Sequence, residues 1–417
     1  MSDRLITSVA GRARAIGQRE FIVLMAALMS LNALGIDTML PALDHIASEL
    51  AVPDPNRRQL VVGVFLVAGA IGSLGPGLYA DRFGRRPVVI ACMALYAVSS
   101  LLCAIAPTFE SLLALRVVQG LGASGAMVLP AAIIRDRFSG DKMARLMSII
   151  FIVFMIVPVL APTLGQAVML VASWHWIFVM LAVLAGTVMA WSWARLPETL
   201  PEALHQPIDP RTILHNLPLT FRTRSAVGYV FGGGLTFGGL FGYINCSQQL
   251  IGEHFGQAEN FPLIFGATAS TLAVTSFVNS RIVERFGARR VSHAALLAFV
   301  FVSLAQIYAA TAHGNSLIWF LPLMSLNLSL LGFMGANFSS IAMQPFAESA
   351  GAAASVQAFI RTLVGALVGI AIGQAYDGSA LPLAEALLAS SLVALALVMF
   401  SEKGRLFRRL NRPGLPT

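Results

Sequence analysis

Apolar residues occur along this chain in long runs that are separated by short polar gaps. A run of about 18 or more apolar residues that is nearly free of charge is typical of a helix that crosses a bilayer. The runs are continuous, whereas strands of a membrane barrel alternate polar and apolar positions. The pattern therefore predicts an all-α membrane protein with twelve transmembrane helices at residues 20–42, 59–80, 87–106, 111–134, 144–170, 174–195, 226–250, 260–281, 291–311, 316–342, 351–376 and 381–401.

The composition agrees with a membrane protein. The chain is 57% hydrophobic and only 12% charged, whereas a soluble domain has roughly 25% charged residues. So few charges cannot cover a water-soluble surface of this size. Its three cysteines, Cys92, Cys103 and Cys246, lie inside apolar runs and match no metal-ligand spacing. We expect core cysteines, no metal and no cofactor.

The basic residues predict how the chain is oriented. The formal net charge is +8, which in a soluble protein would suggest nucleic acid, but here the arginines lie in the gaps between apolar runs. Of 28 lysines and arginines, only Arg57 and Arg58 fall in gaps on the outer side, and Arg116 and Arg361 lie inside spans. Because inner segments carry the excess of basic residues, we expect both termini to be cytoplasmic. The segment 1–19 has no cleavage site, so we expect a retained first helix.

An internal repeat divides the chain in two. The longest gap, 196–225, contains five prolines and is predicted to link a bundle at 1–195 to a bundle at 226–417. Residues 77–86 read GLYADRFGRR, and residues 280–289 read SRIVERFGAR. An acid, an arginine, a phenylalanine and a glycine thus recur six helices later. This repeat predicts two pseudo-symmetric six-helix bundles, an architecture that transporters use.

Several motifs resemble a known family. Residues 77–86 resemble the signature loop of the major facilitator superfamily, G-x-L-x-D-R-x-G-R-R, with Tyr79 at the usual leucine. Residues 116–122, RVVQGLG, are similar to a motif of proton-coupled members. Residues 158–165, PVLAPTLG, resemble the antiporter motif, with Gln166 at a common glycine. The segment GIDTMLPA at 35–42 and the eleventh span resemble the Bcr/CflA drug-resistance group. This resemblance implies a drug:proton antiporter in a bacterial inner membrane.

Asp37 and Arg116 are the predicted proton-coupling pair. A carboxylate inside an apolar span costs roughly 2.5–3.5 kcal/mol on insertion scales, so Asp37 is expected to be protonated, paired or next to water. Desolvation favours the protonated form, which is what a proton site needs. The alternative for Asp37 is an interfacial acid near the outer end of its helix. Arg116 lies at a similar depth and is expected to couple to Asp37, with or without a direct pair. Its alternative is a structural arginine bonded to backbone carbonyls.

The family resemblance also implies two structural devices. One is a cytoplasmic gate whose acid and arginines latch helix ends, with Glu284 and Arg285 as a degraded copy; the other is a kinked, tightly packed fifth span that seals the cavity against proton leak. The alternatives are charges that only set topology and an ordinary helix kink. The gate residues are Gly77, Asp81, Arg82, Gly84, Arg85 and Arg86, and the antiporter residues are Pro158, Pro162 and Gly165.

Polar residues inside spans are the candidates for a substrate cavity. Arg361 lies in the middle of the eleventh span, so it must face the bundle interior or water. It could attract an anionic substrate or have a structural partner. The other candidates could equally bond neighbouring helices; they are Asn32, Tyr243, Asn245, Gln248, Gln249, Asn327, Asn337 and Gln344.

The function predicted from these features is a proton-coupled antiporter that exports small, largely hydrophobic organic compounds by alternating access, as in multidrug or antibiotic efflux. An exporter of a metabolite or amino acid with the same fold is the alternative, and Arg361 would then bind a carboxylate. Scattered histidines, at His175, His254, His293 and His313, do not support a membrane enzyme, and the chain has no phosphate-binding loop. The expected partners are a small-molecule substrate, protons and the bilayer, without nucleic acid, and we expect a monomer.

Overall fold

The computed structural model describes residues 16–138, 140–201, 203, 205, 221–314 and 316–407. Most of the predicted linker and of the basic tails lies outside these ranges, as do the side chains of Lys142 and Arg145. Every regular element in the described part is helical. The elements are α1 Gln18–Asp37, η1 Leu40–Ala42, α2 Leu43–Glu49, η2 Pro55–Gln59, α3 Leu60–Gly72, α4 Gly75–Phe83, α5 Arg85–Cys103, α6 Phe109–Arg137, α7 Gly140–Val171, α8 His175–Arg195, α10 Arg224–Gln248, η4 Gln249–His254, α11 Phe261–Phe286, α12 Ala288–Ala312, α13 Leu317–Met343, η5 Gln344–Ser349, α14 Ala350–Gln374 and α15 Leu381–Ser401.

These elements coincide in order with the predicted spans. In the described part, 10 helices are long and apolar enough to cross a membrane, and the pair Pro55–Gly72 and Gly75–Phe83, bent by 43°, brings the number to 11. The remaining predicted span falls on α7, of which Ile156–Val171 qualifies only as a shorter apolar helix. The all-α multi-span fold is therefore confirmed, while the count of twelve stays a prediction.

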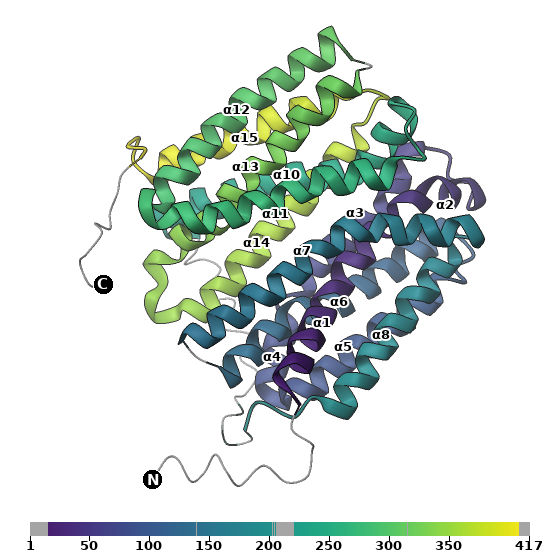
Figure 1. The fold of residues 1–417 in the computed structure, drawn as a ribbon, viewed down its shortest axis with the longest axis vertical. Coiled ribbons are helices and arrows are strands. Elements are labelled where there is room, and N and C mark those ends of the chain that lie inside the picture. Colours follow the sequence, from purple (N-terminus) through teal and green to yellow (C-terminus); the bar gives the residue numbers. More distant parts are fainter. Residues whose placement is uncertain are drawn as a thin grey trace.

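The helices form two groups that meet at one end. In the first group, α5 contacts α6 and α8, and α3 contacts α6; in the second, α10 contacts α14 and α15, and α12 contacts α13. Figure 1 shows the two groups as purple-to-teal and green-to-yellow ribbons. The groups touch where α3 packs against α14 and α7 against α11. We call the two ends of the molecule the α2 end and the α4 end, because these helices lie at opposite ends (Figure 1).

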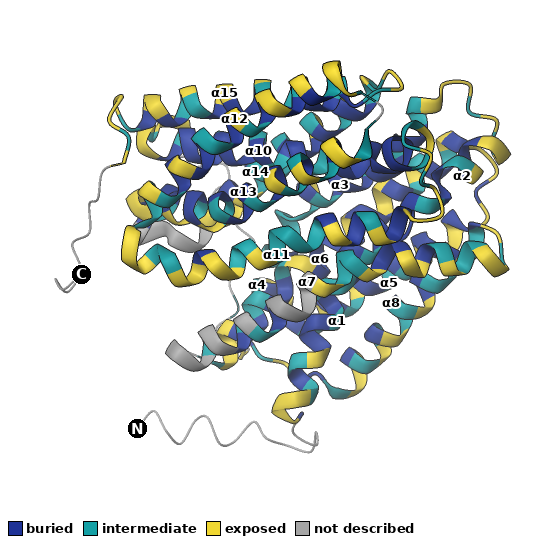
Figure 2. Ribbon diagram, turned by 45° about the horizontal axis from the view of Figure 1, so that its top comes forward, coloured by how far each residue is buried: buried dark blue, intermediate teal, exposed yellow. Residues whose placement is uncertain are grey.

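The outer surface of the helix bundle is apolar. Large hydrophobic side chains are freely exposed there, including Leu170 at 80%, Val171 at 86% and Ile318 at 83%. Figure 2 shows the buried residues concentrated between the helices and the exposed ones on the outside. In water such a large exposed apolar surface would promote aggregation. In a bilayer these apolar side chains face lipid. The helical backbone is stable there because its hydrogen bonds are satisfied within each helix.

The first span is longer than predicted and is broken in the middle. The chain continues beyond residue 42 through η1 and α2, so that the whole span runs over Gln18–Glu49. Pro41 has no N–H to donate to the carbonyl of Asp37, so α1 ends at Asp37. The Thr38 hydroxyl closes the last turn by donating to the carbonyl of Leu34 at 2.6 Å. Asp37 therefore lies at a break well inside the span.

Gly120 tests the packing of α6 on α3. A Cβ atom at this position would lie 2.5 Å from the carbonyl oxygen of Phe65 and 2.9 Å from the Cβ of Ala68. Gly120→Ala should therefore destabilise the protein by about 1–3 kcal/mol through overpacking. Thermal unfolding in detergent measures the effect. Gly186→Ala on α8 is the control, because no atom lies within 4 Å of its added Cβ. Equal Tm values for the two variants would contradict the packing.

Candidate functional site: a buried acid and the charged clusters at the two ends

Asp37 is a buried acid at the broken end of α1. The residue is 3% exposed. Its Oδ1 atom is buried and accepts no hydrogen bond from any described residue. The structure records no ion pair to Asp37 within the described part of the chain. The site thus holds a carboxyl group in an apolar interior without a partner for one of its oxygens, which is costly for the ionised form.

Arg116, in contrast, is fully engaged by protein groups. Its side chain is completely buried, and its Nε donates to the carbonyl of Val61 at 2.8 Å, while Nη2 donates to the carbonyl of Gly35 at 2.8 Å. The guanidinium lies 4.3 Å above the ring of Phe65. Gly35 belongs to the last turn of α1, where carbonyls lack helical donors and favour a cation. Arg116 is thus bonded to backbone carbonyls, and it holds the helix end that carries Asp37.

A polar chain continues from Arg116 across the first helix group. Its Nη1 donates to Gln119 at 2.6 Å, one helical turn away on the same face. Gln119 in turn donates to the hydroxyl of Ser100 on α5 at 2.6 Å. On the same helix, the hydroxyl of Tyr96 donates to the carbonyl of Leu31 on α1 at 3.1 Å. The arginine–glutamine spacing that the sequence singled out therefore ties α6 to α1, α3 and α5.

The glycine of the antiporter motif packs against the break in α1. A Cβ atom on Gly165 would overlap with the carbonyl oxygen of Thr38. Only glycine therefore allows α7 to approach the chain directly after Asp37. Pro158 and Pro162 both lie inside α7.

The same helix also touches the second group. A Cβ on Gly266 of α11 would lie 3.0 Å from the carbonyl oxygen of Val159, next to the first proline. The motif is thus placed where α7 meets both the broken helix of its own group and a helix of the other group. Its sealing role stays a prediction.

The loop at the α4 end forms a compact charged cluster. Gly84 has φ +92°, a conformation that favours glycine. The buried Arg85 donates from Nη1 to Asp81 at 2.6 Å and from Nε to Asp136 at 2.8 Å. The backbone N–H groups of Arg85 and Arg86 donate to the carboxylate of Glu198 at 2.8 and 3.1 Å. The acid at the end of α6 and the acid after α8 were not among the residues that the sequence indicated.

The other predicted gate residues take different positions. Arg86 donates to the carbonyl of Trp193, so it fastens the loop to α8. Arg82 is exposed, and Gly77 is half-buried within α4. All the recorded bonds of this cluster remain within the first helix group. Whether the cluster latches the two groups in another state stays a prediction.

The second helix group contains a related cluster. Gly287 has φ +86°, and Arg289 donates to Glu402 at 2.8 Å. Glu402 follows α15 as Glu198 follows α8, so an acid beyond the last helix of each group binds the repeated loop. Burial acts to raise the pKa of Glu402, but hydrogen bonds from Tyr229 and Arg289 outweigh it and leave this pKa below its usual value. In the described residues, the ion pair of this loop is made by Arg289, and the role of Glu284 and Arg285 as a degraded copy of the gate stays a prediction.

The α2 end is closed by polar contacts between the two groups, which we call the α2-end latch. Arg58 is 6% exposed and forms ion pairs with Asp44 of α2 and with Glu253 of η4. Asp44 also accepts a hydrogen bond from Gln248 of α10. These contacts join segments of the chain that are about two hundred residues apart.

Further hydrogen bonds extend the same latch. Gln59 donates to Gln249, and Asn56 donates to the carbonyls of Gln374 and Tyr376 at 3.2 and 2.6 Å. Gln248 and Gln249, which the sequence placed in a cavity, are thus part of a contact between the groups, and Gln248 also borders a cavity of about 290 Å³. Arg58, which the sequence treated only as a topology charge, lies at the centre of this contact.

The remaining cavity candidates do not converge on one site. Asn337 donates to Asn279 at 2.9 Å, and Asn327 donates to Gln306 at 2.5 Å, so both join helices within the second group. Gln344 accepts from Arg289 at the α4 end.

Three further candidates have different surroundings. Asn32 donates to the sulfur of Met127 at 3.3 Å, which joins α1 to α6. Tyr243 stacks on Phe265 with ring centroids 5.7 Å apart. Asn245 is buried and its side-chain amide has no described hydrogen-bond partner.

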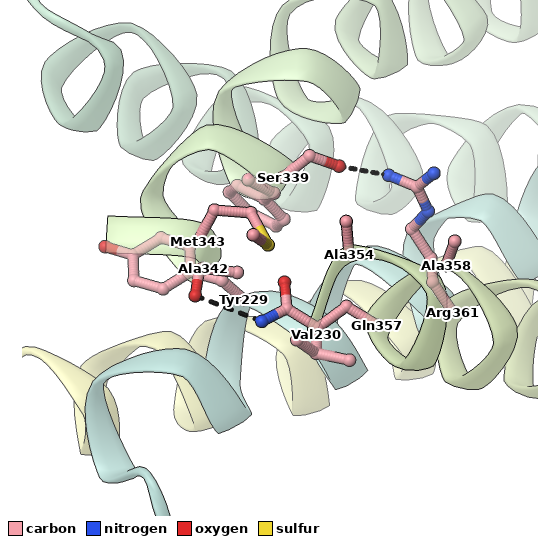
Figure 3. Close-up of a pocket in the computed structure, with 10 residues that line it drawn as sticks. Tyr229, Val230, Ser339, Ala342, Met343, Ala354, Gln357, Ala358 and Arg361 are labelled. Carbon is pink, nitrogen blue, oxygen red and sulfur yellow. Dashed lines mark hydrogen bonds between the residues drawn. The ribbon is translucent and has the colours of Figure 1, made fainter. Parts of the chain in front are cut away.

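Arg361 borders a cavity of about 150 Å³ between α10, α13 and α14. Figure 3 shows this cavity, with the guanidinium pointing to the hydroxyl of Ser339. The sequence could place Arg361 in an apolar helix, but it could not show which residues surround it.

Taken together, two groups of long apolar helices that meet where α3 packs on α14 and α7 on α11 define a multi-span helical membrane protein. The sequence model of the Major Facilitator Superfamily matches residues 25–369. The chain belongs to this superfamily.

Known relatives and solved structures support this assignment. The chain is 29% identical to the bicyclomycin resistance protein homolog of Haemophilus influenzae over 87% of this chain and 91% of that protein. It is 30% identical to the multidrug resistance protein MdtL of Escherichia coli over 93% of this chain and 96% of that protein. A solved bacterial homolog of the human lysosomal transporter Spinster, described as inward-facing and occupied, shares the fold with a TM-score of 0.69 at 16% identity over 92% of this chain and 96% of that one.

Arg58 provides a test of the α2-end latch. Arg58→Gln leaves Asp44 and Glu253 without their shared cation, so the two groups should separate at this end. Spin labels on Ser48→Cys and Ala258→Cys, both exposed at the α2 end, report the separation by pulsed electron paramagnetic resonance. We expect the distance distribution to shift to longer values in Arg58→Gln.

Arg57→Gln is the matched control for this experiment. Arg57 pairs only across the first group, with the exposed Glu110 at 3.1 Å, and exposed pairs contribute about 0–1 kcal/mol. Its distance distribution should equal that of the parent. An unchanged distribution in Arg58→Gln would show that the latch does not hold the α2 end closed.

Proposed function

We propose that this protein is a proton-coupled antiporter that exports small, largely hydrophobic organic compounds across a bacterial inner membrane. Membership of the superfamily supports transport as the general activity. The relatives named for bicyclomycin and multidrug resistance support export of foreign compounds as the specific one. Proton coupling rests on the observation described next.

The environment of Asp37 is the observation that carries the proposal. Its buried Oδ1 accepts no hydrogen bond from a described residue. The donor nitrogens of the nearby Arg116 are bonded to Gly35, Val61 and Gln119 instead. An ionised carboxylate without a counterion is expensive at such a position, whereas a neutral acid is tolerated. The proton therefore belongs on Asp37 in this conformation. A conformation that admits water to the break in α1 would release it.

The charges support an orientation for this cycle. In the described part, the basic residues between helices lie at the α4 end, except for Arg57 and Arg58 at the α2 end. The positive-inside rule then makes the α4 end cytoplasmic. The latch thus closes the outer side of the protein, and the loops of Arg85 and Arg289 belong to the inner side. In this proposal the bundles 1–195 and 226–417, joined by 196–225, tilt within a single monomer.

Coupling requires that each ligand prefer one of the two orientations. A ligand with equal affinity for both states shifts nothing. The buried, unpartnered Asp37 favours the state shown here when it is protonated. Substrate that binds from the inner side must favour the other orientation, in which the α2-end latch is open.

Asp37→Asn tests the proposal. The amide is nearly isosteric with the protonated acid but cannot release a proton, so the protein should fold normally while pH-gradient-driven transport falls to the level of empty vesicles. Uptake of ethidium into inverted membrane vesicles, together with proton release recorded with a pH-sensitive dye, measures both quantities. Glu110→Gln is the control, since this acid is exposed and belongs to a surface pair.

Two results would decide against a proton site at Asp37. One is gradient-driven transport by Asp37→Asn at the parental rate. The other is transport by the parent protein that continues undiminished when a protonophore collapses the gradient.

A further inference from the structure

Arg361 carries a charge inside the second helix group that no described carboxylate neutralises. Its Nη1 donates to the hydroxyl of Ser339 on α13, and its guanidinium lies 5.5 Å above the ring of Phe237 on α10. Within the described residues, the structure records no ion pair to Arg361 and no hydrogen bond from its Nε or Nη2. A full charge at such a depth in a membrane helix normally has a partner. Among the described residues the structure records no such partner.

A comparison with Arg116 shows how unusual this is. The guanidinium of Arg116 is completely buried and donates to protein acceptors from Nε and from both Nη atoms. Arg361 is partly accessible and donates only one recorded hydrogen bond, to the hydroxyl of Ser339. Its stem lies against Gly233, where an added Cβ would be 3.3 Å from Cδ. Arg361 is thus held in place by its neighbours while two of its donor nitrogens stay available.

Arg361 borders the cavity of about 150 Å³ between α10, α13 and α14. In Figure 3, Arg361 and Gln357 lie on one side of the cavity, with Ser339 and Met343 on the other. Tyr229 also lines it, but its hydroxyl is committed to Glu402, which Arg289 already neutralises. The guanidinium therefore sets the electrostatic character of the cavity. Pockets that enclose drug-sized ligands have volumes of roughly 300–1,000 Å³, so this smaller space suits a polar group with a few carbons and not an entire drug-sized molecule.

We propose that this cavity is a subsite for the carboxylate of an amphiphilic organic anion, with Arg361 as the residue that binds it. This inference rests on the proposed function, and it names the class of substrate. A guanidinium carries parallel donors that match the two oxygens of a planar carboxylate. One cation balances one negative charge, whereas a doubly charged phosphate would keep an excess charge in an apolar setting. The apolar wall of Val230, Phe338 and Met343 receives the hydrocarbon part next to the acid.

Binding of a matched pair of probes tests the proposal on the full-length protein in detergent. The probes are radiolabelled naphthalene-2-carboxylate and its uncharged primary amide, measured by equilibrium dialysis. The parent protein should bind the carboxylate about tenfold more tightly than the amide, because a charge-assisted bidentate pair is stronger than a neutral one. Arg361→Gln should bind both probes alike. Arg361→Lys should give an intermediate preference, since it keeps the charge but loses the two-pronged edge.

Three controls make the result specific. Arg281→Gln removes an exposed arginine of the same helix group and should keep the parental preference. Ser339→Ala removes the acceptor of Nη1 and should weaken the preference without abolishing it, which provides a second test if Arg361→Gln does not fold. Asp37→Asn should keep the preference for the carboxylate.

The outcomes separate this inference from the proposed function. Equal binding of the two probes to the parent protein, or no binding of the carboxylate, would overturn the subsite. A preference that persists in Arg361→Gln would overturn it as well. If the preference follows Arg361 but transport ignores the proton gradient, the subsite stands and proton coupling fails.

Discussion

The buried hydrogen bonds from Arg116 to the carbonyls of Gly35 and Val61 fix the geometry on which the proposed mechanism depends. α1 ends at Asp37 because Pro41 cannot continue the backbone ladder, and a free helix end inside an apolar bundle needs a donor. A hydrogen bond to a charged group contributes about 1.5–3 kcal/mol, so Arg116 can hold this end firmly. Asp37 is thereby fixed at a break in the helix while the arginine that fixes it remains otherwise occupied.

The two ends of the molecule differ in a way that suits alternating access. At the α2 end, Arg58 joins Asp44 of one group to Glu253 of the other, so its bonds cross between the groups. At the α4 end, Arg85 and Arg289 bind acids of their own group. In the proposed cycle, the latch at the α2 end opens and new contacts form at the other end, where the partly exposed acids of these pairs exchange partners.

Hydropathy predicted the helices well because the bilayer demands one apolar segment of set length for every crossing. It could not predict the α2-end latch, since nothing local marks Asp44, Arg58 and Glu253 as partners across two hundred residues. Pro41 indicates the break after Asp37 from the sequence alone. The predicted first span nevertheless ended at residue 42, whereas the observed span continues to Glu49. For Arg116 and Arg361, hydropathy alone could show only a charge inside an apolar helix. The structure shows that protein acceptors bind all three donor nitrogens of Arg116, whereas Arg361 borders a cavity.

The most direct test of the central claim is an infrared measurement of the Asp37 carboxyl group itself. Difference spectra of the reconstituted protein and of Asp37→Asn, recorded at neutral pH, isolate the C=O stretch of a protonated acid. The account predicts that the parent protein shows this band, at the frequency of a weakly hydrogen-bonded acid, and that Asp37→Asn lacks it. Spectra that are identical in this region, or a parent spectrum that assigns an ionised carboxylate to Asp37, would contradict the account.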